Sequence, residues 1–214
     1  MKHCIIMTII GFFSGAVMYS YLIPRIFFKT DITKTSEDGN PGSSNAVKAA
    51  GLPAGIICMA LDVSKAFVPV FISVYIMNIN GLYLVPVVVA PVAGHAFSPM
   101  MRFNGGKAVS TTYGSLLGLV TISSFVFALA VIMAIFRFIV VIRPDSSSVI
   151  TSKGAASIFS AVFIPVLWLK TVAIFFSIIV TIKQMQRPDK GEHSVSIWHY
   201  SLALENKRLK FSKI

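Results

Sequence analysis

Long apolar runs separated by short polar stretches dominate the hydrophobic pattern of the chain. Five such runs are present, covering residues 4–23, 51–76, 82–97, 114–136 and 155–182. A bilayer-crossing helix needs about 20 predominantly apolar residues, so the pattern predicts five strong membrane spans. The last two long runs could each be broken by a kink, in which case seven helices are expected. The predicted fold is an all-α, polytopic membrane helix bundle.

The polar stretches between these runs are expected to be loops outside the bilayer. They cover residues 24–50, 98–113 and 137–153, with a basic segment after residue 182. In that segment Val195, Trp198 and Leu202 have helical spacing beside basic residues, which predicts an interfacial helix or, alternatively, a disordered tail. We therefore expect a transmembrane domain over residues 1–192 and a tail over 193–214. The first run resembles the apolar core of a signal peptide, but its length predicts a retained span.

Composition supports the membrane assignment. The 214 residues are 55% hydrophobic and only 13% charged, and the mean hydropathy is +0.78. A soluble domain usually carries about 25% charged residues, so this chain has too little polar surface to cover a water-facing globule. Cys4 and Cys58 both lie in apolar runs and are expected to be small buried hydrophobes rather than a disulfide or metal site.

The distribution of basic residues predicts the orientation in the membrane. The net charge is +11, but the basic residues lie at the ends of apolar runs and in the tail, which argues against nucleic-acid binding. With five spans, thirteen Lys and Arg residues fall on one side and four on the other: Lys2, Arg137, Arg143 and Lys153. The positive-inside rule then places the stretches 24–50 and 98–113 and the tail in the cytoplasm, with the N-terminus outside the cell membrane.

Two cytoplasmic loops carry residues suited to binding phosphate. The first loop contains Asp38, Gly39, Asn40, Pro41, Gly42, Ser43, Ser44, Asn45 and Lys48, and leads into a helix. Glycines allow several N–H groups to face one anion, and a helix N-terminus adds partial positive charge. The alternative for this loop is a plain turn followed by a helix N-cap.

The second loop has paired glycines, a lysine and hydroxyls that open the next span. Its residues are His95, Asn104, Gly105, Gly106, Lys107, Ala108, Ser110 and Thr111. These are the ingredients of a phosphate cradle, although the Walker A spacing is absent. The alternatives are a glycine turn with a snorkelling lysine, and an interfacial histidine rather than a base at position 95.

Asp62 and Lys65 lie three residues apart in an apolar run, on one face of the predicted helix. A charged pair inside a span usually faces the interior of the bundle and marks a functional site. The alternative is a purely structural ion pair.

Taken in order, these motifs resemble the bacterial PlsY family of membrane glycerol-3-phosphate acyltransferases. The resemblance covers about residues 4–120 and continues weakly to about 183. It implies acyl transfer from acyl phosphate to glycerol-3-phosphate, giving lysophosphatidic acid, with no metal, nucleotide or covalent nucleophile. The catalytic residues implied are His95 and Lys107. Those implied to bind the substrates are Asp38, Gly39, Asn40, Gly42, Ser43, Asn45, Lys48, Asp62, Lys65, Gly105, Gly106, Ser110 and Thr111.

Four positions depart from the family pattern. Asp38 stands where the family commonly has Ser, Lys48 where it has Arg, and Ala108 where it has Gly. The best register places Thr181 at an Asn of a third motif. A carboxylate near a phosphate is unfavourable unless a cation or the acceptor's hydroxyls compensate it. These changes leave open a paralogue with an altered acceptor, an inactive scaffold, or, from another class, a small transporter.

Overall fold

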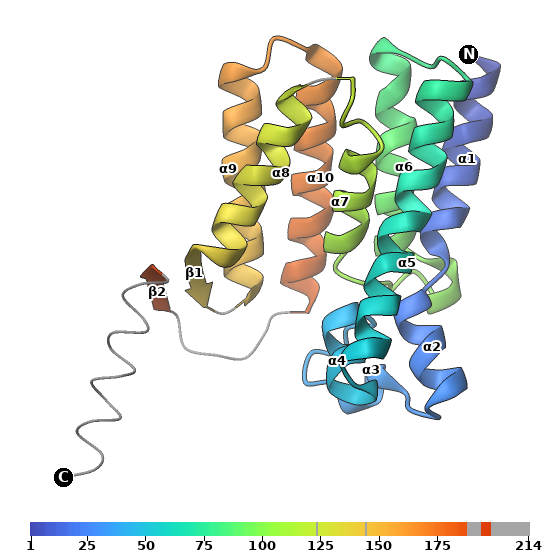
Figure 1. Cartoon of the computed structure of the whole chain (residues 1–214), viewed down its shortest axis with the longest axis vertical. Coiled ribbons are helices and arrows are strands. Elements are labelled where there is room, and N and C mark those ends of the chain that lie inside the picture. The colour runs from blue at the N-terminus through green and yellow to red at the C-terminus, as the bar shows by residue number, and fades with distance from the viewer. Residues whose placement is uncertain (123, 144, 188–193, 198–214) are drawn as a thin grey trace.

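Seven long helices form the bundle among the residues that the computed structural model describes, which are 1–122, 124–143, 145–187 and 194–197 (Figure 1). They are α1 (Lys2–Ala16), α5 (Leu52–Phe71), α6 (Leu84–Ala96), α7 (Val109–Leu117), α8 (Ser124–Phe138), α9 (Asp145–Phe163) and α10 (Leu167–Gln186). The predicted all-α bundle is confirmed. Four segments are long and apolar enough to cross a membrane: Lys2–Phe27, Leu52–Ile76, Gly81–Met101 and Leu167–Gln186.

Shorter elements lie at the ends of the bundle. They are α2 (Tyr19–Phe27), α3 (Ile32–Thr35), α4 (Ser43–Ala50), a π-helical turn η1 (Ile72–Ile76) and the 3₁₀ turns η2 (Gly81–Tyr83) and η3 (Pro99–Met101). The stretch 24–50, expected to be a loop, thus contains α3, α4 and the end of α2. These three helices cluster below the N-terminal end of α5 (Figure 1).

The apolar run 114–136 is not one span, which corrects the five-span prediction. α7 ends at Leu117, residues 118–122 form turns, and α8 begins at Ser124. Gly118 and the hydroxyl-bearing Thr121 and Ser124 have weak helix propensity, which allows the break. The apolar run alone therefore predicted one helix where the structure has two, α7 and α8.

The run 155–182 is also broken, at Pro165. α9 ends at Phe163 and α10 begins at Leu167. Proline lacks an N–H donor and disfavours the α conformation in the residue before it, so one helix ends here and another starts. The alternative with seven helices, raised by possible kinks in the last two runs, is therefore the one that the fold adopts.

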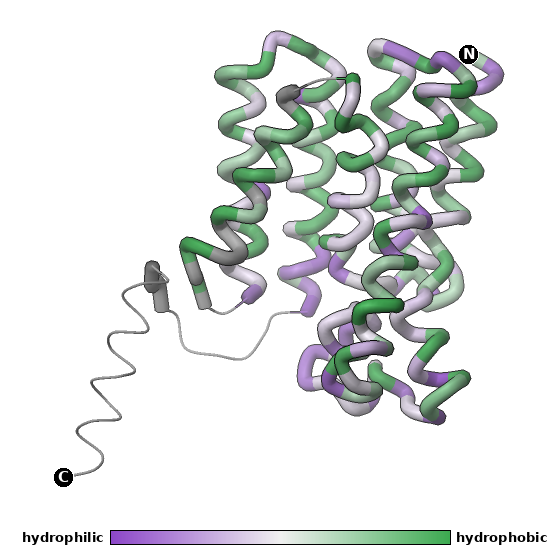
Figure 2. Tube along the Cα trace, in the orientation of Figure 1, coloured by the Kyte–Doolittle hydropathy of each residue, from purple (hydrophilic) through white to green (hydrophobic). Residues whose placement is uncertain are grey.

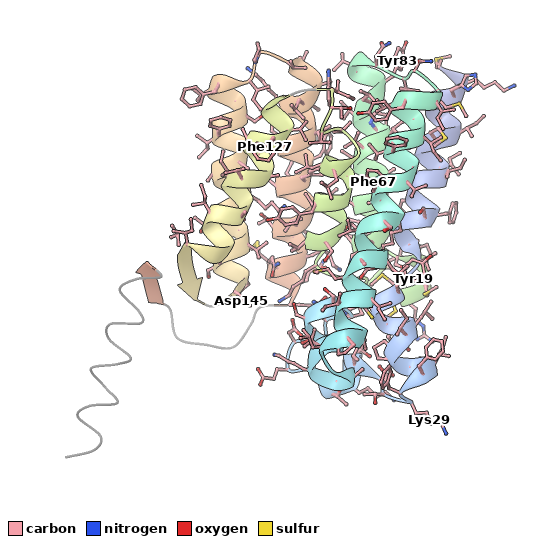
Figure 3. All side chains as sticks on the ribbon, in the orientation of Figure 1. Tyr19, Lys29, Phe67, Tyr83, Phe127 and Asp145 are labelled. Atoms are coloured by element: carbon pink, nitrogen blue, oxygen red, sulfur yellow. The ribbon has the colours of Figure 1, made fainter. Side chains whose placement is uncertain are left out.

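The two additional helices place β1 (Val140–Arg143) and Asp145 at the other end of the bundle from the one predicted. They lie at the same end as α4 and the C-terminal end of α10 (Figure 1), and Asp145 is labelled there in Figure 3. The prediction that put Arg137, Arg143 and Lys153 opposite the two motif loops is wrong. Lys153 instead lies within α9 with a buried side chain. The asymmetry of basic residues between the two ends is thus larger than five spans implied.

A short antiparallel ladder joins β1 (Val140–Arg143) to β2 (Ser194–Ile197), with Val140 opposite Ile197. Residues 194–197 are therefore a strand, not part of the expected interfacial helix. Residues 198–214, including Trp198 and Leu202, lie outside the described residues, and the boundary between a transmembrane domain and a tail at residue 193 stays a prediction.

Close packing of α1 on α6 positions the functional end of the bundle. A Cβ atom added to Gly15 would lie 2.0 Å from the Pro91 carbonyl oxygen, and one added to Gly94 would lie 2.0 Å from that of Phe12. Small residues let membrane helices approach this closely. The outer faces of the long helices are apolar, whereas hydrophilic residues gather at the end that carries α3 and α4 (Figure 2). The chain is a multi-pass membrane protein.

Candidate functional site

The two motif loops meet at an ion pair between Asp38 and Lys107. The Lys107 Nζ lies 2.9 Å from Asp38 Oδ2, and the two side chains are only 11% and 12% exposed. A largely buried pair of this kind is screened less by water than a surface pair. The predicted convergence of the two loops is therefore present, with a carboxylate and an ammonium at its centre.

Two asparagines of the first loop connect the ion pair to the backbone. Asn45 donates from Nδ2 to Asp38 Oδ1 at 2.8 Å and to the Asn40 carbonyl oxygen at 2.9 Å. The Asn40 N–H donates to Asp38 Oδ1 at 3.1 Å, and Asn40 Oδ1 accepts a bond from the Lys107 N–H at 3.3 Å. Asn40 and Asn45 are both buried. Their amides thus fix the Asp38 carboxylate and hold the second loop against the first.

The pKa of Asp38 lies below its ordinary value. Burial acts to raise the pKa, but the hydrogen bonds from Lys107, the Asn40 backbone and Asn45 lower it by more. Asp38 is therefore a carboxylate at neutral pH, and it neutralises a cation that the sequence assigned to substrate phosphate. Lys48 does not compensate Asp38, because its side chain is exposed on α4 and makes no ion pair with another described residue.

Gly105 and Gly106 do not form the expected cradle of free N–H groups. The Gly105 N–H donates to the Ala96 carbonyl and the Gly106 N–H to the His95 carbonyl, both at 3.1 Å. A Cβ on Gly105 would lie 1.9 Å from the His95 carbonyl oxygen, and one on Gly106 would lie 2.3 Å from His95 Nε2. The glycines are needed because the loop packs directly on the end of α6. The cradle prediction is wrong for these two N–H groups.

Ala108 has a backbone conformation that favours glycine. Its φ of +58° and ψ of 19° lie in the left-handed region, where it caps the N-terminus of α7. A residue with a Cβ atom pays about 1–2 kcal/mol for this conformation. The departure from glycine at this position therefore strains the loop that carries Lys107.

A buried network within the bundle holds His95. The Lys65 ammonium lies 2.6 Å from Asp62 Oδ1, 2.9 Å from His95 Nδ1 and 2.5 Å from the Val17 carbonyl oxygen. Three acceptors match its three N–H bonds. The Val17 carbonyl is available because the first span is interrupted between α1 and α2. Ser20 donates to the other oxygen of Asp62.

This network places Asp62 and Lys65, which were predicted to bind substrate, inside the bundle. Their exposed fractions are 1% and 6%, and their polar atoms are occupied by Ser20, Val17 and His95. The charges of the buried pair compensate each other, and the Lys65 ammonium is directed at groups within the bundle. We assign both residues to positioning the His95 ring.

The C-terminal end of α10 contributes two cations that the sequence did not single out. Arg187 donates to the carbonyl oxygens of Gly39 and Asn104, the latter at 2.9 Å. Lys183 donates to Asn104 Oδ1 at 3.2 Å. Burial lowers the pKa of Arg187, and the nearby Asp38 carboxylate acts in the opposite direction. The sequence signal was available only as part of the count of basic residues after the last apolar run.

The remaining predicted residues fall into three groups. Gly42 caps α4 and Ser43 opens it, so their backbone adjoins Asn40 and Asn45, as does that of Gly39. Thr111 donates to the Ala108 carbonyl at 3.0 Å, which makes it a local cap, and Ser110 occupies the first turn of α7. Thr181 is half-buried one turn before Gln184, which is 2% exposed and has an unpaired Oε1.

Comparison with known proteins gives the family. The family described as glycerol-3-phosphate acyltransferase matches residues 5–190 of this chain. A protein of Pseudothermotoga lettingae with the same description is 32% identical over 198 residues, covering 90% of each chain. Another, of Endomicrobium trichonymphae, is 29% identical over 209 residues and covers 98% of each.

A solved structure has the same fold. It is the crystal structure of PlsY, an integral membrane glycerol 3-phosphate acyltransferase, in its glycerol 3-phosphate form. The TM-score is 0.71 at 23% identity, and the match covers 86% of this chain and 88% of that one. The arrangement of helices is therefore shared over almost the whole described bundle.

Proposed function

The chain belongs to the glycerol-3-phosphate acyltransferase family, and from this membership we infer that it acylates glycerol-3-phosphate to lysophosphatidic acid and propose acyl phosphate as the donor. The observation that carries the proposal is the family match over residues 5–190. The meeting of both motif loops at Lys107 supports it. With the family established, the transporter alternative has no observation in its favour.

The charge at the site suits a phosphate monoester. Lys107, Lys183 and Arg187 bring three positive charges to the two loops, and Asp38 brings one negative charge. The net charge of these four groups is about +2, and a phosphate monoester carries about −1.5 to −2 at pH 7. Complementary charge of this size attracts the acceptor and offsets the desolvation of its phosphate.

We assign the phosphate of one substrate to Lys107 and the first turn of α4. Lys107 is the cation at the junction of the loops, and it pairs with Asp38. Asn45, in the first turn of α4, donates a hydrogen bond to Asp38. The first N–H groups of a helix have no intrahelical partner and, with the helix dipole, favour an anion. Gly42 and Ser43 supply this end of α4. Lys48 remains a further candidate phosphate ligand.

His95 is better suited to donate a hydrogen bond than to act as a base. Lys65 donates to His95 Nδ1, so a neutral ring carries its proton on Nε2. Nε2 faces Gly106, beside Lys107. From there the ring can donate to the acyl carbonyl oxygen or to phosphate, where negative charge develops during acyl transfer. Asp62, through Lys65, fixes the ring in this orientation.

The acyl transfer requires mainly that the protein position the two substrates and stabilise charge. An acyl phosphate is already activated, because phosphate is a good leaving group. The enzyme has to bring a hydroxyl of glycerol-3-phosphate to the acyl carbonyl carbon and to stabilise charge on the phosphate. Apolar outer helix faces at the same end of the bundle are suited to the acyl chain of the donor.

We further propose that the site faces the cytoplasm. The segment with α3 and α4, the loop before α7, β1 and the end of α10 lie at one end of the bundle (Figure 1). Together they carry nine Lys and Arg residues: Arg25, Lys29, Lys34, Lys48, Arg102, Lys107, Arg143, Lys183 and Arg187. The positive-inside rule assigns such an end to the cytoplasm of the cell membrane. The N-terminus, at the opposite end in Figure 1, is then outside.

A donor comparison tests the proposal. Purified protein is supplied with labelled glycerol-3-phosphate and, in separate reactions, palmitoyl phosphate, palmitoyl-coenzyme A or palmitoylated acyl carrier protein. Lysophosphatidic acid is expected with palmitoyl phosphate alone. Equal or faster product formation from a thioester would overturn the assignment of the donor, and no product from any donor would overturn the activity.

A further inference from the structure

The ammonium of Lys183 is held by neutral groups at the end of α10. Lys183 lies in the last turn of this helix, and only 1% of the residue is exposed. Its Nζ donates to Asn104 Oδ1 at 3.2 Å and to Gln186 Oε1 at 2.8 Å, and it lies 5.5 Å from the centre of the Phe97 ring. Among the residues that the structure describes, it forms no ion pair with a carboxylate.

The other two cations of the site are already engaged. Lys107 is neutralised by Asp38 at 2.9 Å. Arg187 donates to one backbone carbonyl of each motif loop. A buried cation is unfavourable unless a nearby negative charge compensates its loss of water. An anionic ligand would therefore be most strongly stabilising at Lys183, where the described chain supplies no such charge.

We propose that Lys183 binds the phosphate of the acyl donor, in a second anion site separate from the one at Lys107 and α4. This inference rests on the proposed function, in which two substrates with phosphate groups are bound together. A phosphate carries about −1.5 to −2 charges at pH 7 and is a stronger partner for an ammonium than two neutral amide oxygens. It therefore replaces the Asn104 and Gln186 oxygens on Lys183.

The two side chains that cover the Lys183 ammonium are placed so that a ligand can displace them. Asn104 and Gln186 are both exposed. Asn104 also follows Arg102 and Phe103, whose φ angles of +51° and +63° lie in the left-handed region that residues with a Cβ atom adopt at a cost. The segment before Asn104 is thus not held in a strongly preferred conformation, and its amide can turn away from the ammonium.

The surroundings of Lys183 favour the donor over the acceptor as its ligand. Ile178, Ile182 and Met185 are exposed on the outer face of α10, by 49%, 40% and 70%. An acyl phosphate has a long apolar chain that remains in the bilayer, whereas glycerol-3-phosphate has none. A donor whose phosphate meets Lys183 can keep its chain along this outer face, in the lipid.

This placement also brings the reacting carbonyl to the groups that the reaction needs. Phe97, which the Lys183 ammonium contacts, lies two residues after His95, so the carbonyl next to the donor phosphate reaches the end of α6 that carries the His95 ring. Asn104 lies three residues before Lys107 in the same loop. The two anion sites are therefore neighbours, and each has its own ammonium.

Lys183→Gln tests the proposal, because glutamine removes the charge and keeps a polar side chain. The KM for palmitoyl phosphate is expected to rise by about tenfold to a hundredfold, while the KM for glycerol-3-phosphate should change by less than about twofold. Lys183→Arg, which keeps the charge, should raise the donor KM by less than about threefold. The matched control is Lys170→Gln, which removes an ammonium bonded to the Ala161 carbonyl in the first turn of the same helix and should leave both KM values within twofold.

Direct binding separates a ligand contact from a structural role. Hexadecyl phosphate has a phosphate and a chain but no acyl group to transfer, and its Kd, measured by calorimetry in detergent, should rise tenfold or more in Lys183→Gln. Thermal unfolding verifies that each variant is folded. The proposal is wrong if Lys183→Gln binds hexadecyl phosphate as tightly as the wild type, if the larger change is in the KM for glycerol-3-phosphate, or if Lys183→Arg loses as much as Lys183→Gln. Failure of wild-type protein to make lysophosphatidic acid would instead refute the proposed function, since the binding measurement needs no turnover.

Discussion

The Lys107 ammonium lies 2.9 Å from the Asp38 carboxylate. This ion pair joins the loop that precedes α5 to the loop that follows α6. The cation expected to meet a phosphate is thus already neutralised by an acid of its own chain. At an effective dielectric constant of about 20, a pair of unit charges at about 4 Å interacts by about 4 kcal/mol. A substrate phosphate that binds Lys107 must therefore compete with Asp38 for the ammonium.

Replacing Lys107 by Ala should lower kcat/KM by about a hundredfold or more, because a preorganised positive charge at the phosphate is lost. Initial rates with acyl phosphate and glycerol-3-phosphate measure the effect. Lys29→Ala, which removes an exposed lysine at the same end of the molecule (Figure 3), is the matched control and should change the rate by less than about twofold. Near-normal turnover in folded Lys107→Ala would contradict the phosphate assignment.

Arg187 should act as a clamp between the loops. Its guanidinium donates to the carbonyls of Gly39 and Asn104, one in each loop. Hydrogen bonds from a charged donor contribute about 1.5–3 kcal/mol each, so Arg187→Gln should lower kcat/KM by about tenfold to a hundredfold. Arg187→Lys should be intermediate, because lysine cannot span both carbonyls in one plane.

The control for this clamp is Lys34→Gln, which removes an exposed positive charge from α3. Limited proteolysis of the segments before α4 and α7 supplies a second readout, and cleavage should be faster in Arg187→Gln. If Arg187→Gln and Lys34→Gln give the same kinetics and the same cleavage, Arg187 does not hold the loops.

Ala108→Gly should stabilise the protein, because glycine adopts the observed φ of +58° without the steric cost of a Cβ atom. The expected gain in the free energy of unfolding is about 1 kcal/mol, seen as a higher midpoint of thermal unfolding in detergent. Ala60→Gly in the middle of α5 is the control and should destabilise by about 1 kcal/mol. A lower midpoint for Ala108→Gly would mean that this loop conformation is not the native one.

The orientation can be tested with single cysteines and a membrane-impermeant thiol reagent in intact cells, after replacement of Cys4 and Cys58. Cysteines at Ser36, Asn104 and Asp145 should be protected, whereas one at Asn80, at the opposite end, should react. Asp145 discriminates between seven helices and five, because five spans would place it outside. Labelling of position 145 from outside would contradict the topology.

The helix bundle and the two motif loops could be predicted from the sequence because the signals are local. Apolar runs identify the spans, and the spacing of Asn40, Asn45, His95 and Lys107 places them at helix ends on one side. The contributions of Lys183 and Arg187 could not be predicted. The sequence placed both residues at the same end as the two motif loops, but their contacts with Gly39 and Asn104 depend on how the end of α10 packs against those loops.

The contacts between side chains within the site also could not be predicted from the sequence. The sequence indicated that Asp38 needed a cation or the acceptor's hydroxyls, and it left open which cation that was. The packing of the second loop on the end of α6 decides in favour of Lys107, and it also uses the Gly105 and Gly106 N–H groups that seemed free for phosphate. Such choices depend on three-dimensional packing and not on local pattern.

The proposed reaction transfers an acyl group from acyl phosphate to glycerol-3-phosphate. Its most direct test measures phosphate release and lysophosphatidic acid formation in the same sample of purified protein. We expect equal amounts of the two products, almost no phosphate release without glycerol-3-phosphate, and a parallel loss of both in Lys107→Ala. Phosphate release that continues unchanged without the acceptor, or lysophosphatidic acid formed without phosphate release, would contradict it.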